Sequence, residues 1–221
     1  MPDVSEYNPL DYENLTINLV RELMQRTPSP LPPAERFRGA GVYALFYRGG
    51  FGPYQHPYVR SDEAEHPIYV GKAVPAGART GSSRGGRSSA SELYSRLREH
   101  SESIGVAQNL ELADFVCRFL VVTPLWITMA ERFLIENFQP VWNVCIEGFG
   151  LHDPGRGRHQ GLLPWWDALH PGRAWAASLQ QGRTSADAET RLREFLALRE
   201  ADPAEARRRA AQAAANVDAE A

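Results

Sequence analysis

Two short stretches that each carry a tyrosine constrain the fold of this chain more than any other feature. Gly41–Tyr47 (GVYALFY) and residues 67–71 (PIYVG) have the aromatic and β-branched content typical of strands. Side chains alternate between the two faces of a strand, so Tyr43 points away from the apolar residues on either side of it. If the strands are neighbours, Tyr43 and Tyr69 point at one spot. The alternative is that each is an ordinary, half-buried strand residue.

Length and composition favour one domain with additions. The chain has 221 residues, of which 43% are hydrophobic, and its net charge is −3. A net negative charge does not indicate nucleic-acid binding by the chain as a whole, although a local basic patch is sufficient for such binding. Cys117 and Cys145 lack metal-ligand spacing, which predicts buried free thiols in a reducing compartment. No apolar run is long enough to span a bilayer, so we expect a cytoplasmic protein without membrane contact.

The order of the predicted elements indicates an α/β (α+β) fold. A third strand is predicted at residues 115–122, where nearly every side chain is apolar. Apolar stripes predict helices at residues 11–25, at about 89–103 and at 125–138, where Leu125 belongs to the stripe. We therefore expect a small, three-stranded, mostly antiparallel sheet flanked by helices.

Three segments follow from this pattern. Residues 1–38 form an N-terminal helix and a proline-rich connector, 39–145 form the core, and 146–221 form a C-terminal extension. The extension is a Gly/His/Trp-rich segment followed by a charged helix. Two insertions interrupt the core at 48–66 and 74–90, and the second carries glycine, serine and arginine without any acid. Such a loop is either a solvated linker or a contact for DNA.

GVY at 41–43 and YVGKA at Tyr69–Ala73 resemble the paired motifs of the GIY-YIG nuclease superfamily. The resemblance covers residues 39–144, because ERFLI at 131–135 and PVWN at 140–143 are similar to the end of the superfamily core. Valine replaces isoleucine in both short motifs, which is harmless on a strand. The remaining polar residues of the superfamily also occur in order, and the full set is Tyr43, Tyr69, Lys72, Arg96, Glu131 and Asn143.

Hydrolysis of a phosphodiester requires a positioned water, neutralisation of the phosphate charge and a path for protons. Glu131 is the carboxylate that the motif selects to hold one Mg²⁺ per active site, an ion that keeps most of its waters. The planar guanidinium of Arg96 suits the scissile phosphate. Without the motif, both residues would be interpreted as ordinary surface side chains of helices.

The resemblance implies a tyrosine that orients or deprotonates water, and Tyr43 is favoured over Tyr69. A phenol is a weak base at its ordinary pKa, and Lys72 at the adjoining strand end is a cation that would favour the phenolate. His100 shares a helix face with Arg96 and stands where repair nucleases have another tyrosine. A histidine at this position is typical of the restriction branch, and the resemblance implies that it assists proton transfer or hydrogen-bonds the phosphate. Asn143 is expected to tie strand backbone to the site.

The stretch PWWDALHPGRAWA at 164–176 resembles a type II restriction endonuclease subgroup that cuts CCGCGG. The alternatives are a structure-selective repair nuclease and a DNA-binding protein with an inactive nuclease fold. A palindromic double-stranded site implies a homodimer, a cognate DNA methyltransferase and association with the bacterial nucleoid. Arginine pairs bidentately with guanine, so the candidate DNA-reading residues are Arg79, Arg84, Arg87, Arg156 and Arg158.

Overall fold

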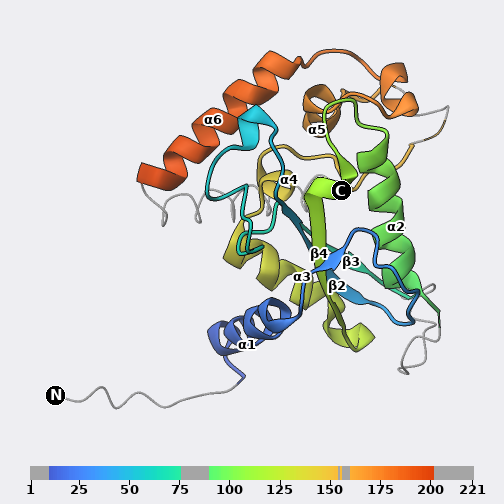
Figure 1. Cartoon of the computed structure of the whole chain (residues 1–221), viewed down its shortest axis with the longest axis vertical. Coiled ribbons are helices and arrows are strands. Elements are labelled where there is room, and N and C mark those ends of the chain that lie inside the picture. The colour runs from blue at the N-terminus through green and yellow to red at the C-terminus, as the bar shows by residue number, and fades with distance from the viewer. Residues whose placement is uncertain (1–9, 76–89, 154, 156–159, 202–221) are drawn as a thin grey trace.

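The computed structural model describes residues 10–75, 90–153, 155 and 160–201. Within these residues a four-stranded antiparallel sheet lies between two layers of helices (Figure 1). Its strands, in the spatial order β1-β4-β2-β3, are β1 (Ser29–Pro30), β2 (Gly41–Tyr47), β3 (Tyr69–Ala73) and β4 (Phe115–Val121). The predicted α+β fold is confirmed, with one strand more than the three expected.

The additional strand comes from the proline-rich connector, which pairs with the outer edge of β4. Ser29 lies opposite Cys117, and Pro30 lies opposite Val116. Proline has no N–H to give to a ladder, so it is tolerated only at the edge of a sheet, as it is here. The sequence does not predict this strand, because two residues among prolines are too few to show strand periodicity.

The central strand β2 has both faces covered, and all seven of its residues are buried. Tyr43 pairs with Gly71 of β3, and Leu45 pairs with Tyr69. The predicted alternation is confirmed, because odd-numbered and even-numbered residues of β2 enter different apolar clusters. The cluster on the tyrosine face takes Tyr43, Leu45 and Tyr47, and the opposite cluster takes Val42, Ala44 and Phe46.

Two helices form the layer behind the sheet, and they pack on the face opposite to Tyr43. These are α1 (Tyr12–Gln25) and α3 (Pro124–Phe138), which also contact each other. The tyrosine face contributes to a cluster shared with α2 (Glu92–Gly105), α4 (Val141–Val144), α5 (Trp165–Leu169) and α6 (Ser185–Ala201). Short 3-10 helices lie at Gly52–Tyr54, Leu112–Asp114 and Ala174–Ser178. Tyr43 and Tyr69 therefore lie on the sheet face that α2 covers, whereas Glu131 belongs to α3 of the other layer.

A buried polar network ties the first insertion and the C-terminal extension to the core. The Trp142 indole N–H donates to the Tyr54 hydroxyl at 2.7 Å, and that hydroxyl lies 2.5 Å from His170 Nε2. His170 Nδ1 lies 2.8 Å from the side-chain oxygen of Asn109. Four segments far apart in the chain thus meet in one chain of hydrogen bonds. The insertion at 48–66 packs into the molecule through this contact.

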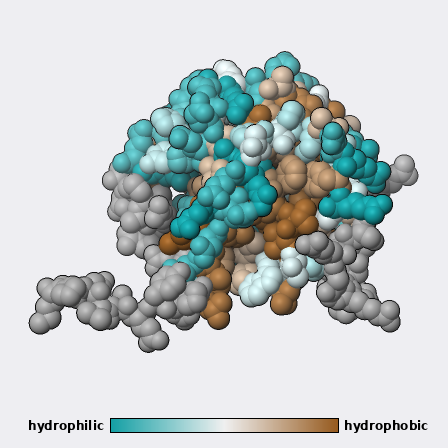
Figure 2. Space-filling model, turned by 60° about the horizontal axis from the view of Figure 1, so that its bottom comes forward, coloured by the Kyte–Doolittle hydropathy of each residue, from teal (hydrophilic) through white to brown (hydrophobic). Residues whose placement is uncertain are grey.

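The first turn of α3 departs from the predicted core stripe. Leu125 is 80% exposed, whereas Ile127 and Ala130 are buried, so the prediction for Leu125 was wrong. The helix begins directly after the end of β4, and its first turn therefore extends beyond the sheet that the rest of the helix covers. Large apolar side chains of α1 and of the β4–α3 junction are also exposed, and Figure 2 shows hydrophobic surface on the side that lies at the bottom of Figure 1.

Both cysteines are free and buried, as predicted. Burial raises the pKa of each thiol to about 12, so neither Cys117 nor Cys145 supplies a thiolate at neutral pH. None of the helices in the described segments combines the length and the apolar character needed to cross a bilayer.

Candidate active site

The two strand tyrosines lie side by side because β2 and β3 are paired. Their ring centroids are 6.2 Å apart. The glycine of the YVG motif makes this possible, since a Cβ at Gly71 would lie 2.3 Å from the Tyr43 hydroxyl and 3.0 Å from the Tyr69 ring. Any larger residue at that position would displace one or both phenols.

Tyr43 is hydrogen-bonded to a histidine from α2. The distance from its hydroxyl to His100 Nε2 is 2.5 Å, and both side chains are buried. Burial raises the pKa of Tyr43 well above its usual value and lowers the pKa of His100 well below its usual value. At neutral pH the pair therefore consists of a neutral phenol and a neutral imidazole, between which a proton can move.

Arg96 lies one helical turn before His100 and faces the same tyrosines. Its positive charge lowers the pKa of Tyr43 and of Tyr69, but burial is the larger effect, and the pKa of Tyr69 is raised to about 12. The cation beside Tyr43 is thus Arg96. The sequence suggests Lys72 for that position, but this side chain points to another partner.

Lys72 pairs with Glu131, and this contact joins the end of β3 to α3. The ammonium nitrogen lies 2.7 Å from Glu131 Oε2, and both side chains are partly exposed. Burial raises the pKa of Glu131, and the hydrogen bond and charge of Lys72 oppose that shift. The pair keeps a carboxylate at the border of the helix core, where an unpaired charge would be unfavourable.

These side chains line one open cleft of about 690 Å³. A water molecule in the liquid occupies about 30 Å³, so a phosphate group with several waters fits there. Tyr43 lies at its floor with no exposed surface, and His100 lies behind Tyr43. Five of the seven predicted site residues therefore line the cleft, namely Tyr43, Tyr69, Lys72, Arg96 and Glu131.

Asn143 does not line the cleft but holds the backbone of the strand that carries Tyr69. Its side-chain oxygen accepts from the Val70 N–H at 2.8 Å, and its side-chain nitrogen donates to the Val70 carbonyl at 2.8 Å. Both backbone groups of the residue beside Tyr69 are thereby satisfied. The side chain acts on the site through the strand.

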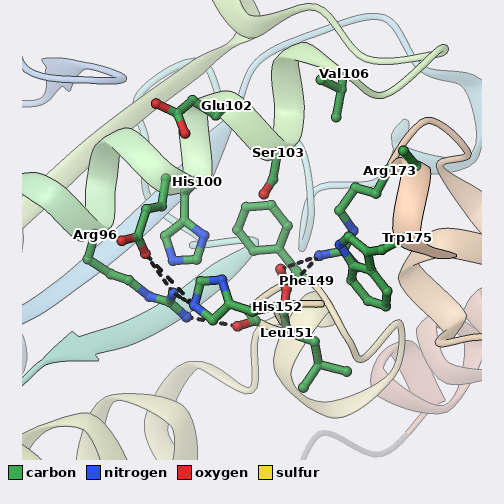
Figure 3. Close-up of a pocket in the computed structure, with 13 residues that line it drawn as sticks. Arg96, His100, Glu102, Ser103, Val106, Phe149, Leu151, His152, Arg173 and Trp175 are labelled. Atoms are coloured by element: carbon green, nitrogen blue, oxygen red, sulfur yellow. Dashed lines mark hydrogen bonds and ion pairs between the residues drawn. The ribbon is translucent and has the colours of Figure 1, made fainter. Parts of the chain in front are cut away.

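The C-terminal extension contributes residues to the cleft that the motif does not reveal. Gly150 and His152 line it, and Arg96 donates to the Gly150 carbonyl at 2.8 Å. Figure 3 shows His152 beside Arg96 and His100. Arg36 of the connector also lines the cleft. The 164–176 motif indicates the importance of the extension, but no periodicity or spacing indicates these individual residues.

The two insertions differ in their relation to the cleft. Val74 and Ala90, at the two ends of the second insertion, line it, whereas none of its described lining residues comes from 48–66. The DNA-reading candidates in the second insertion and the extension lie outside the described residues. They are Arg79, Arg84, Arg87, Arg156 and Arg158.

Glu131 is the residue of this cleft that best fits a divalent cation. Among the described residues there is no group of three or more His, Cys, Asp or Glu side chains that could hold a metal. A single carboxylate fits Mg²⁺, which is commonly bound by one or two carboxylates, waters and phosphate oxygens of the substrate. Lys72 pairs with Oε2 of Glu131, and the carboxylate lines the open cleft.

The antiparallel sheet, the paired tyrosines on neighbouring strands, and the arginine and glutamate on flanking helices define a GIY-YIG nuclease domain. A family model described as the Eco29kI GIY-YIG domain matches residues 35–196, which is well over half of the chain. The chain therefore belongs to this family of restriction endonuclease GIY-YIG domains, and it is a nuclease for which the family implies DNA as the substrate. A comparison with curated proteins found no match.

Proposed function

We propose that this chain is a type II restriction endonuclease that hydrolyses both strands of DNA at the palindrome CCGCGG, with one Mg²⁺ at Glu131 of each active site. One observation carries the proposal: Tyr43, Tyr69, Lys72, Arg96 and Glu131 line one open cleft. The family match and the 164–176 motif support the restriction activity.

The chemistry of each side chain suggests its role in the reaction. Arg96 binds the scissile phosphate through its planar fork and neutralises charge that develops there. Arg96 flanks Tyr43 in this structure. When the Arg96 side chain turns toward the phosphate, water gains access to the Tyr43 hydroxyl. The water oxygen forms the new bond to phosphorus, its proton passes to the Tyr43 oxygen, and the Tyr43 proton passes to His100 Nε2.

His100 suits this role because it is neutral and contacts the phenol directly at 2.5 Å. The proton thus moves along an existing hydrogen bond, and no free phenolate is required in the resting enzyme. The bond from phosphorus to the leaving oxygen breaks, and Lys72 stabilises the negative charge in the cleft. A bound Mg²⁺ would polarise the phosphate and stabilise the leaving oxygen.

Recognition of a symmetric site requires two copies of the chain related by a two-fold axis. We propose that the 74–90 insertion and the 148–172 segment read the bases, because both reach the cleft at residues that the structure describes. A cognate DNA methyltransferase would protect the host site. Size-exclusion chromatography with light scattering, with and without a CCGCGG duplex, tests the dimer.

Digestion of a plasmid of known sequence in Mg²⁺, followed by sequencing of the ends, tests the function. Cuts confined to CCGCGG are expected, and cuts at branched DNA junctions or at random sites would contradict the proposal. Glu131→Gln should lower cleavage by at least about 10³-fold while DNA binding persists, and an excess of chelator should do the same. Glu136→Gln is the matched control, since Glu136 is on the same helix but pairs with Arg132 outside the cleft.

A further inference from the structure

Arg173, within the 164–176 motif, is almost wholly buried and uses every N–H group it has. Its side chain and that of its ion-pair partner Asp167 are 4% and 1% exposed. Nε donates to Asp167 Oδ1 at 2.7 Å, and Nη2 donates to Oδ2. The guanidinium also lies over the rings of Trp166 and Trp175, at 4.5 and 4.7 Å from their centroids.

The remaining donors of Arg173 hold the backbone of one loop at residues 148–152. Nη1 donates to the carbonyls of Phe149 and Leu151 at 3.0 and 3.1 Å, and Nη2 donates to the Gly148 carbonyl at 2.9 Å. A guanidinium has five N–H groups, and all five have acceptors here. Arg173 therefore has no donor left for DNA, and its function must be exerted through the loop.

This loop contacts three side chains of the active site. Gly150 accepts from Arg96 at 2.8 Å, and a Cβ at Gly150 would lie 2.6 Å from the Tyr69 hydroxyl. Phe149 stacks on His100, with ring centroids 4.5 Å apart and an angle of 21°, and it packs edge-on against Tyr69. Figure 3 shows Arg173 reaching the loop from one side and Arg96 reaching it from the other.

Stability alone is a poor explanation for this arrangement. Replacing a buried ion pair with apolar residues is often neutral or even stabilising, because the desolvation of two charges offsets their attraction. Arg96 is at the same time paired through Nη1 with Glu99, at 2.9 Å. Without the loop, Nη2 would lose its acceptor at Gly150, and the pair with Glu99 would draw the Arg96 fork away from the two phenols.

We propose that Arg173 is a positioning residue for cleavage: it fixes the 148–152 loop, which in turn sets Arg96 and His100 in the nuclease site. This inference rests on the proposed function for its catalytic consequence. Displacements of about 1 Å in a catalytic group can lower a rate by about 10²-fold, so the effect should appear in the chemical step. DNA binding, which depends on many contacts, should change little.

Arg173→Lys tests this, because lysine keeps the charge but cannot make five directed hydrogen bonds. Arg183→Lys is the matched control, since Arg183 also lies over a tryptophan, Trp165, and donates to the Leu163 carbonyl. Both variants are confirmed as folded by circular dichroism. The single-turnover rate on saturating CCGCGG duplex should fall about 10²-fold for Arg173→Lys, with a Kd within about threefold of wild type, and neither value should change for Arg183→Lys.

A second readout requires no cleavage. Nuclear magnetic resonance titration should show wild-type His100 neutral through the mildly acidic range, and in Arg173→Lys the pKa should move toward about 6.5 as the loop releases the ring to solvent. If wild type does not cut DNA, the proposed function fails and this titration alone decides the positioning role. If Arg173→Lys does not fold, Asp167→Asn replaces it in both measurements, with an expected loss of at least about 10-fold. Wild-type cleavage rates or a wild-type His100 titration in the folded variant would overturn the proposal.

Discussion

Lowering the pH should destabilise this protein through one buried histidine, His170. The direction of every hydrogen bond around it can be derived, because the indole of Trp142 is only a donor. The Tyr54 oxygen accepts that bond, so its own proton must go to His170 Nε2. His170 is therefore neutral with its proton on Nδ1, which donates to Asn109. A second proton on Nε2 would leave the Tyr54 hydroxyl without an acceptor.

The magnitude follows from the pKa, which burial lowers from 6.5 to about 3. Since the folded pKa is lower than the unfolded pKa, the stabilisation is complete above pH 6.5 and is lost as the pH falls toward 3. Each pH unit below 6.5 costs about 1.4 kcal/mol, so His170 alone should cost roughly 2 kcal/mol at pH 5.0. That is a large share of the 5–15 kcal/mol by which domains of this kind are usually stable.

Urea unfolding followed by tryptophan fluorescence at pH 7.5 and 5.0 measures this effect. His170→Gln keeps an acceptor for Tyr54 and cannot take up a proton, so it should lose roughly 2 kcal/mol less than wild type between the two pH values. Contributions from other groups, including the buried His100, are common to both proteins and cancel in the difference. Equal pH dependence of the two proteins, within about 0.5 kcal/mol, would refute the derived network.

Three further predictions concern the site. Tyr43→Phe and Tyr69→Phe should each lower cleavage by at least about 10²-fold while circular dichroism shows the fold retained, and normal cutting by both would make them core residues only. Asn143→Ala should lower the free energy of unfolding by about 1–3 kcal/mol in a urea titration, because both backbone groups of Val70 lose their partner; no change would contradict that bond pair. Replacing a candidate arginine should lower the preference for one base of the site by about 1–3 kcal/mol, measured on a panel of CCGCGG variants. If no substitution changes any base preference, these arginines do not read the bases. The substitutions are Arg79→Ala, Arg84→Ala, Arg87→Ala, Arg156→Ala and Arg158→Ala.

Local patterns in the sequence were sufficient for three of the four strands and the main helices, and the family resemblance supplied five residues of the cleft. Alternation on β2 predicts that Tyr43 faces away from its neighbours, and a separation of four residues places Arg96 and His100 on one face of α2. These inferences succeed because each depends on the geometry of one element. The short strand β1 and the exposed Leu125 were mispredicted for the same reason, since pairing and burial there depend on what lies beside the element.

The sequence by itself therefore determined most of the elements, the family and five polar residues of the cleft. Only the tertiary structure decided their partners: Lys72 pairs with Glu131, Arg96 is the cation beside Tyr43, and His100 contacts the Tyr43 hydroxyl. It also decided that Gly150, far along the chain, lines the cleft and accepts from Arg96, in a loop whose backbone Arg173 contacts. The physical reason is that hydrogen bonds and ion pairs act over a few ångströms in space, whereas periodicity in a sequence reports only the neighbours within one helix or strand.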